Sequence, residues 1–189
     1  MKILSENIVY SGKIFSMIQQ QVKIGDNIKT FEVARRAPGT RLIIVNKQWE
    51  ILLSKEYRTE TKNYDVRLPW WKVFDTLSEY EWFLSSGENI QEAATQWAIK
   101  EAQEEVWIVA NNVDFFAKSV SGATVTWDLY YFVVREYSQE KQSLEEGEDI
   151  SFDFYAPEIV KKMCLDGTIQ EDRSAMMLMK FLHQSTPGL

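Results

Sequence analysis

The sequence predicts an α/β (α+β) fold with a mixed sheet and a few helices, arranged either as a simple α+β fold or as an α/β/α sandwich. Three observations lead to this prediction. The first forty residues contain β-rich runs separated by turn residues. Asn89–Val106 is rich in Ala, Glu, Gln and Lys, which favour a helix. Aromatic and β-branched strands then precede two helical segments at the end of the chain.

The N-terminal half predicts strands joined by turns. Two or three strands fill the first forty residues, with a turn at Gly25-Asp26-Asn27. Arg41–Val45 and Ile51–Lys55 predict a hairpin around a turn near Asn46–Trp49. The next expected elements are a polar loop at Thr59–Asp65, a short strand that runs into a loop at Val66–Val73, and a short helix or ordered insertion at Ser78–Ser86 that ends at Gly87.

The C-terminal half predicts strands, an acidic loop and two helices. Its expected elements after the Asn89–Val106 helix are strands at Val113–Val120, Trp127–Tyr137 and Ile150–Ala156, an acidic loop at Ser138–Asp149, and helices at Pro157–Gly167 and Glu171–Gln184. Pro157 near the start and Gly167 at the end of the first of these helices match the usual asymmetry of helix termini.

Charge and composition restrict the partners that we expect. The net charge of −7 disfavours nucleic acid as a partner, because phosphate neutralisation needs clustered Lys and Arg. An acidic chain can still act on phosphorylated small molecules if a divalent cation lies between them. Apolar runs are too short for a membrane span, and polar residues come too early for a signal peptide, so we expect a cytoplasmic protein. Cys164 is the single cysteine, which excludes an internal disulfide.

Three carboxylates share one face of the predicted Asn89–Val106 helix. Glu101, Glu104 and Glu105 stand at i, i+3 and i+4, so they lie within about 100° around the helix axis. Such a face is either solvated, which is the common outcome for an isolated acidic helix, or it binds a cation. Hard oxygen ligands at this spacing suit Mg²⁺ or Mn²⁺.

The segment KEAQEEVWI around these glutamates resembles the second half of the Nudix box, Arg-Glu-U-x-Glu-Glu-x-Gly-U, where U is a bulky aliphatic residue. Lys100 stands for the Arg of the box, and Glu92 stands eight positions earlier, as the box requires. The likeness extends over most of the chain, through VYSGKIF, VARRAPGTRLIIV, ILLSKEYR and WDLYYFVV, to the ADP-ribose pyrophosphatase-like branch of the family. An insertion at residues 74–86 interrupts the box, which spans 68–108.

The resemblance implies a single Nudix domain over residues 1–189, a Nudix-type α/β/α sandwich whose N-terminal strands (1–38) form an extension. It implies hydrolysis of a nucleoside diphosphate linked to another moiety, with ADP-ribose or a nucleotide sugar as the substrate. Glu101, Glu104, Glu105 and the backbone carbonyl of Trp71 would hold Mg²⁺ (or Mn²⁺). A glutamate of the acidic loop would act as base, with Glu145, Glu146 and Glu148 as candidates.

Two arginines and a family dimer complete these expectations. Arg58 and Arg67 are candidates for contacts with substrate phosphate, since Arg suits bidentate contacts, and surface ion pairs are the equally plausible alternative. Trp127 is expected to pack in the core rather than to stack on a base. The family branch also implies a homodimer through the N-terminal strands.

The chain departs from the family pattern where tryptophan replaces glycine. The glycine-like positions hold Trp70 and Trp71 in the PWWK segment, Trp107 just after the helix, Trp97 within it and Trp49 in a turn, with Trp82 less clear. Glycine is scarce, at 8 residues, while tryptophan, at 7, is abundant. Replacing six of these tryptophans by glycine would restore a usual glycine frequency of about 7%.

Three explanations for this pattern remain open. In the first, a gene whose UGA codons mean glycine was translated with a code that reads UGA as tryptophan; UGG codons at these positions would contradict that hypothesis. In the second, the substitutions were engineered. In the third, the chain is a catalytically impaired Nudix domain that binds or regulates, because tryptophans at Trp70 and Trp71 would distort the metal-binding loop.

Overall fold

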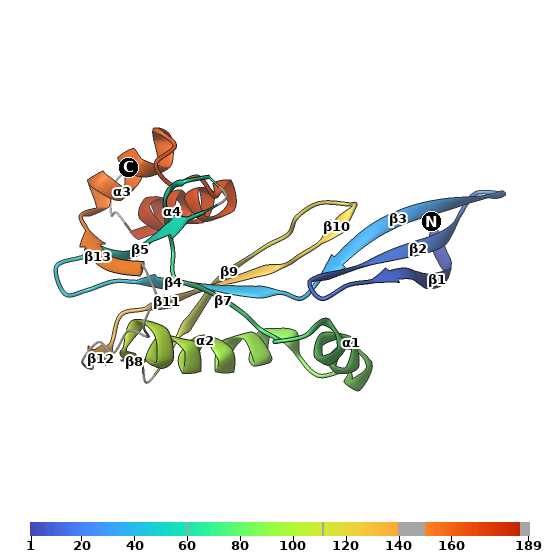
Figure 1. Cartoon of the computed structure of the whole chain (residues 1–189), viewed down its shortest axis with the longest axis horizontal. Helices are drawn as coiled ribbons and strands as arrows, with labels where there is room; N and C mark the ends of the chain where they lie inside the picture. Colours follow the sequence, from blue (N-terminus) through green and yellow to red (C-terminus); the bar gives the residue numbers. More distant parts are fainter. Residues whose placement is uncertain (60, 111, 140–149, 186–189) are drawn as a thin grey trace.

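The structure, a computed structural model, describes residues 1–59, 61–110, 112–139 and 150–185. Figure 1 shows an elongated molecule: a helix-covered central sheet forms the body, and a strand arm projects from it at the end opposite the C-terminal helices. The mixed sheets and helices confirm the predicted α+β class. None of the described helices combines the length and the apolar character needed to cross a membrane.

The central sheet has the strand order β7-β4-β11-β9. Its strands are β4 (Gly39–Ile44), β7 (Trp70–Lys72), β9 (Asp114–Ser119) and β11 (Leu129–Val134). β4 and β11 pair in parallel, while β7 and β9 run antiparallel to their neighbours, so the sheet is mixed, as predicted. Every residue of β4 and β11 is buried, the pattern of strands covered on both faces.

One face of the central sheet packs against α2 (Ile90–Val106), and the predicted Asn89–Val106 helix is therefore confirmed. A strip of Ala94, Ala98, Ala102 and Val106 at i+4 spacing is buried against the sheet. Three of these side chains are only methyl groups, which lets the helix axis lie close to the strands. The opposite side of α2 therefore carries its glutamates away from the core.

The other face is covered by the C-terminal helices, α3 (Pro157–Leu165) and α4 (Asp172–Ser185). Alternation along β4 divides its side chains between the two layers: Leu42 and Ile44 pack on the α2 side, and Ile43 and Val45 on the α4 side. Both C-terminal helices were predicted within a few residues of these bounds. The two-sided cover is the arrangement expected of an α/β/α sandwich.

A second sheet has the order β13-β5-β6. It contains β5 (Ile51–Arg58), β6 (Asn63–Arg67) and β13 (Ile150–Tyr155). The predicted hairpin between β4 and β5 is reduced to the turn and one bridge, Val45 to Ile51. Beyond it the strands diverge into different sheets, because β4 is already paired on both sides by β7 and β11.

The N-terminal arm is a long antiparallel sheet of β1 (Lys2–Ser11), β2 (Phe15–Ile24) and β3 (Asn27–Arg36). Gly25, at the predicted turn, has a φ of 61°, which suits glycine. The short strand β10 (Val125–Thr126) pairs in parallel with the end of β3 and so joins the arm to the body. All ten residues of β1 are exposed.

The predicted insertion contains a capped helix, α1 (Leu77–Ser86). Thr76 and Glu79 form a capping box at its start, and Gly87 ends it in the left-handed conformation with φ 74°. Phe74 and Phe83 anchor this segment in the core beside α2. The remaining short strands, β8 (Ile108–Ala110) and β12 (Tyr137–Gln139), pair with each other after α2.

The PWWK segment forms a strand, which corrects the prediction of a loop. Trp70 pairs with Arg41 and Trp71 with Thr40 in the β7–β4 ladder. Adjacent strand residues point to opposite faces, so Trp71 is buried on the α2 side and Trp70 projects toward the α4 side. The ladder to β4 explains the extended backbone, which a sequence window of three residues cannot reveal.

Candidate functional site

A pocket lined by described residues lies on the α4 side of the central sheet. It has a volume of about 570 Å³ and receives side chains from β3, β4, β5, β6, β7, the segment before β11 and the start of α4. Five arginines and three carboxylates line it: Arg36, Arg41, Arg58, Arg67 and Arg173, with Asp65, Glu171 and Asp172. The lining is therefore positive by two charges, in a chain whose net charge is −7.

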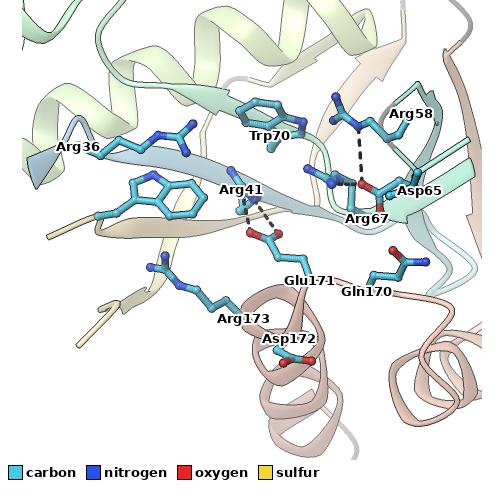
Figure 2. Close-up of a pocket in the computed structure, with 12 residues that line it drawn as sticks. Arg36, Arg41, Arg58, Asp65, Arg67, Trp70, Gln170, Glu171, Asp172 and Arg173 are labelled. Carbon is cyan, nitrogen blue, oxygen red and sulfur yellow. Dashed lines mark hydrogen bonds and ion pairs between the residues drawn. The ribbon is translucent and has the colours of Figure 1, made fainter. Parts of the chain in front are cut away.

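A buried ion pair forms the centre of the pocket. Arg41 is 1% exposed, and its Nη2 and Nε donate to the two carboxylate oxygens of Glu171 at 2.9 and 3.3 Å. The Ser174 hydroxyl also donates to Glu171, at 2.5 Å. Burial raises the pKa of Glu171, but the bonds from Arg41 and Ser174 outweigh it and leave that pKa below its usual value. This pair ties α4 to the central sheet (Figure 2).

A second cluster gathers around Asp65 at one end of the pocket. Arg58 and Arg67 both form ion pairs with its Oδ2, and Arg58 also pairs with Glu56 at 2.7 Å. Within the described chain, Asp65 Oδ1 and the Nε atoms of both arginines are buried and lack a hydrogen-bond partner. Buried polar groups normally find partners, so these three atoms are the ones whose hydrogen bonds the described chain leaves unmade.

Trp70 forms part of the pocket wall between these clusters. The guanidinium carbons of Arg41 and Arg67 lie 5.1 and 5.9 Å from its ring centroid, within cation–π range. Burial, followed by the charge of Arg58, lowers the pKa of Arg67 from its usual value. Arg67 remains protonated at neutral pH all the same, because guanidinium pKa values start so high. Trp70 therefore fills space next to two fixed cations.

The three glutamates of the predicted metal site belong to α2, on the other side of the sheet. Glu101 is half-buried, and Glu104 is exposed and forms an ion pair with Lys100 at 3.5 Å. Glu105 is helical, but its side chain is outside the described residues, as is the loop that holds Glu145, Glu146 and Glu148. The roles predicted for these residues therefore stay predictions.

The chemistry of these side chains fits a hard divalent cation. Carboxylate oxygens are the ligands that Mg²⁺ prefers, and Glu104 lies in the last turn of α2, where the helix dipole disfavours negative charge unless a cation is present. Within the described residues, no group of three His, Cys, Asp or Glu side chains is close enough to hold a metal. A complete site needs Glu105 or the loop at 140–149 as well.

The metal contact predicted for the Trp71 carbonyl also stays a prediction. This oxygen lies 3.1 Å from the position that a Cβ on Gly39 would occupy, so β7 and β4 approach closely here and a larger residue at position 39 would crowd this carbonyl. The indole of Trp71 is buried in the core, and its Nε1 finds no acceptor among the described residues. The indole thus takes no part in the pocket.

Trp107 and Trp49 have the backbone conformation predicted for glycine-like positions. Trp107 ends α2 with φ 52° and ψ 34°, and Trp49 has φ 65° in the turn before β5. Both values lie in the left-handed region, which favours glycine. Trp107 packs edge-on against Phe152, with ring centroids 6.0 Å apart, which partly offsets the strain.

Of the predicted site residues, the structure brings Arg58 and Arg67 together in the pocket, around Asp65. It does not bring Glu101 or Glu104 into that lining, since none of the lining residues belongs to α2. The edge strand β7, with Trp70 on one face and Trp71 on the other, lies between the pocket and α2.

Sequence reasoning missed six charged residues of the pocket: Arg36, Arg41, Asp65, Glu171, Asp172 and Arg173. One signal was available. Arg41 is a charged residue at the start of the apolar run RLIIV, and a buried arginine within a strand requires a carboxylate partner. Nothing in the sequence indicated which carboxylate that would be, because Glu171 is 130 residues away. Trp127, predicted to pack in the core, is half-buried and lines the pocket.

Comparisons with known proteins give a fold relationship. No protein-family model and no curated protein matches the chain. Among solved structures, the chain is similar to a crystal structure of an ADP compounds hydrolase, with a TM-score of 0.68 and 19% sequence identity. The match covers 97% of this chain and 91% of the other. At this identity, the likeness establishes the shared fold along nearly the whole chain.

Proposed function

We propose that this protein is a Nudix-type hydrolase that cleaves the diphosphate of a nucleoside diphosphate linked to another moiety, with ADP-ribose or a nucleotide sugar as substrate. The observation that carries this proposal is the fold, which resembles an ADP compounds hydrolase over 97% of the chain. Within that fold, the residues that resemble the second half of the Nudix box fall on one helix, α2, at its C-terminal end.

Mg²⁺ or Mn²⁺ is the proposed cofactor, held by Glu101, Glu104 and Glu105, with the Trp71 carbonyl as a further ligand. When bound, such a metal neutralises phosphate charge and supplies a water of lowered pKa. Glu146 or Glu148, in the acidic loop, is the proposed base. Glu101 and Glu104 lie on α2, and the alanine face of this helix packs against the central sheet and fixes its position.

The pocket is the proposed binding site for phosphate and sugar groups of the substrate. Arg58 and Arg67 would supply donors there, because their Nε atoms form no hydrogen bond within the described chain. Oδ1 of Asp65 supplies an acceptor suited to a hydroxyl group of a sugar. A site with several cations and one such acceptor suits a phosphorylated sugar better than an apolar ligand.

A second candidate is a Nudix-fold domain that binds a nucleotide without hydrolysing it. The tryptophans favour it: Trp70 occupies space beside Arg41 and Arg67, and Trp107 strains the end of the helix that carries the glutamates. Both effects act on the proposed site without removing its charged groups. Binding would then persist while turnover is lost.

We also propose a homodimer formed through the N-terminal arm. Exposed apolar residues cover β1 and its neighbours, including Ile3, Leu4, Ile8, Val9 and Tyr10 on β1, Phe15 on β2 and Ile28 and Phe31 on β3. β1 is also an edge strand, with one side of its backbone unpaired within the described sheet. A second copy of the arm would cover this surface.

The deciding experiment measures hydrolysis of ADP-ribose and a panel of nucleotide sugars with and without Mg²⁺. The wild-type chain is compared with Glu101→Gln and with the double variant Trp70→Gly plus Trp107→Gly. These two tryptophans are chosen because one lines the pocket and the other has a positive φ, whereas removing buried Trp71 would cost stability through a cavity of its own size.

We expect the glycine variant to cleave substrate in a Mg²⁺-dependent way and faster than the wild type does. Adding Glu101→Gln to the glycine variant should abolish this cleavage. Nucleotide binding without turnover in every version, including the glycine variant, would establish the binding domain instead. If the chain neither binds nor cleaves any compound in the panel, both candidates are rejected.

A further inference from the structure

The charges in the pocket are not evenly compensated. Arg41 is paired with Glu171, Arg58 with Glu56 and Asp65, and Arg67 with Asp65. Among the described residues, no ion pair involves Arg36 or Arg173. The third carboxylate of the lining, Asp172, is exposed and forms no ion pair with any described residue either. Arg36 and Arg173 are therefore the two arginines of the lining that have no ion-pair partner among the described residues.

Both of these arginines are held against one indole, that of Trp127. The guanidinium carbon of Arg36 lies 4.2 Å from the ring centroid, and that of Arg173 lies 5.2 Å from it. Contact with an aromatic ring fixes the position of a guanidinium group but leaves its N–H donors free for an anion. Figure 2 shows Arg36 and Arg173 at one end of the pocket and the Asp65 cluster at the other.

The two guanidinium groups differ in their hydrogen bonds. Arg173 is anchored by neutral partners: its Nε and Nη2 donate to the hydroxyl and the carbonyl of Ser119 at 3.0 and 2.6 Å, and its Nη1 donates to Ser121 at 3.3 Å. No hydrogen bond from the Arg36 side chain is formed within the described chain. Burial, and secondarily the charge of Arg41, lowers the pKa of Arg36, which reports a cation without a counter-charge.

We propose that Arg36 and Arg173, positioned by Trp127, form a phosphate-binding subsite at the end of the pocket next to the arm. A phosphate bound there would face two guanidinium groups that form no ion pair with any described residue. At the opposite end it would have to approach Asp65, which already occupies Arg58 and Arg67 and would repel it. The subsite thus orients a ligand with its phosphate toward Trp127 and its sugar hydroxyls toward Asp65.

This inference rests on the proposed function for the identity of the complete ligand, but it can be tested separately. The probe is inorganic pyrophosphate, and its binding to the full chain is measured by titration calorimetry without divalent cations. A chain that binds pyrophosphate as described but never cleaves ADP-ribose would contradict the hydrolase proposal alone. A chain that cleaves ADP-ribose but whose pyrophosphate binding does not depend on these arginines would contradict the subsite alone.

The variants are Arg36→Gln and Arg173→Gln, with Lys180→Gln as the matched control. Lys180 is an exposed residue of α4, so its replacement removes the same charge from the same helix outside the pocket. We expect each arginine variant to weaken pyrophosphate binding at least about tenfold, the usual effect of losing a hydrogen bond between charged groups. The control should bind as the wild type does.

Two further variants separate this end of the pocket from the other. Trp127→Leu should weaken binding although it removes no charge, because both guanidinium groups lose the ring that positions them. Arg67→Gln, which removes an arginine already paired with Asp65, should weaken it less than either Arg36→Gln or Arg173→Gln. Circular dichroism spectra like that of the wild type show that each variant is folded.

Three results would overturn the proposal. The first is that the folded wild-type chain does not bind pyrophosphate. The second is that Lys180→Gln loses as much affinity for pyrophosphate as the two arginine variants do. The third is that Arg67→Gln loses more of this affinity than either Arg36→Gln or Arg173→Gln. The second would indicate a general effect of net charge. The third would place the phosphate at the Asp65 end.

Discussion

Trp49 has a backbone conformation that is strained for a bulky L-residue and therefore lowers the stability of the fold. Its φ of 65° lies in the left-handed region, and its side chain is exposed, so the indole gains little packing in return. We expect Trp49→Gly to raise the free energy of unfolding by about 1 kcal/mol, the lower end of the penalty for that region. Urea denaturation monitored by circular dichroism measures the change.

Trp82 provides the matched control for this substitution. It is also exposed, but it lies inside α1, where the backbone is helical and glycine is unfavourable. Trp82→Gly should therefore lower the free energy of unfolding by about 1 kcal/mol. Equal effects of the two substitutions would show that backbone conformation is not what distinguishes position 49.

These backbone angles also bear on the origin of the tryptophans. Positive φ at Trp49 and Trp107 is what a glycine would adopt freely, whereas Trp71 is integrated into the core. The hypothesis that UGA codons specify these residues makes a direct prediction: the coding DNA should have UGA at 49, 70, 71, 97 and 107 and UGG at 127. UGG throughout would leave engineering or a natural binding domain as the explanation.

At the scale of elements, the Arg41–Glu171 pair joins β4 to the start of α4. Glu171→Gln leaves the guanidinium of Arg41 buried without a counter-charge, which should lower the free energy of unfolding by about 3–5 kcal/mol at neutral pH. Glu158→Gln, an exposed position on α3, is the control and should change stability little. Urea denaturation of the three proteins measures these differences.

The contribution of Glu171 should depend on pH in a defined direction. Its pKa in the folded state is below its unfolded value, because the bonds from Arg41 and Ser174 outweigh the effect of burial. The stabilisation is therefore present above the unfolded pKa and is lost as the pH falls through the folded pKa. The stability difference between wild type and Glu171→Gln should shrink in acid; a difference that stays constant with pH would contradict this assignment.

The elements differ in how much of them the sequence could predict. α2 and α4 have long windows of helical composition, and α1 has a capping box and a terminal glycine, so all three follow from local signals. β7 does not follow from local signals, because its three residues become a strand only by pairing with β4. The divergence of β4 and β5 likewise depends on β11, which is far away in the sequence.

The same distinction applies to the candidate site. Glu101, Glu104 and Glu105 were identified because they are close in sequence and match a known spacing. The pocket was not identified from the sequence, because Arg36, Trp127 and Arg173 meet only when β3, β10 and α4 assemble. Arg58 and Arg67 were predicted as phosphate contacts because arginine suits bidentate contacts, and their contact with Asp65 required the β5–β6 ladder.

At the scale of the whole molecule, the charge is unevenly distributed. A net charge of −7 surrounds a pocket whose lining is positive by two. Anions with few charges can enter such a pocket, whereas a polyanion would meet repulsion from the rest of the surface. The distribution thus favours the small phosphorylated ligand that we propose over a polyanion.

The arm is the other feature of the whole molecule that calls for a partner. Three long strands with few buried side chains, chiefly Ile18, Val22 and Val33, project away from the body. Isolated sheets of this size need an apolar face covered by another element. If a second copy covers it, the chain should sediment as a dimer, and Ile8→Lys should shift it to a monomer by placing a charge on the exposed face of β1.

Ile159→Lys is the control for that measurement. Ile159 is exposed to a similar degree, 46% against 51% for Ile8, but it lies on α3 at the other end of the molecule. Sedimentation velocity over a range of protein concentrations should show a dimer for the wild type and Ile159→Lys, and a monomer for Ile8→Lys. A monomeric wild type at every concentration would rule out the dimer. Dissociation by both variants would instead place the contact somewhere other than the arm.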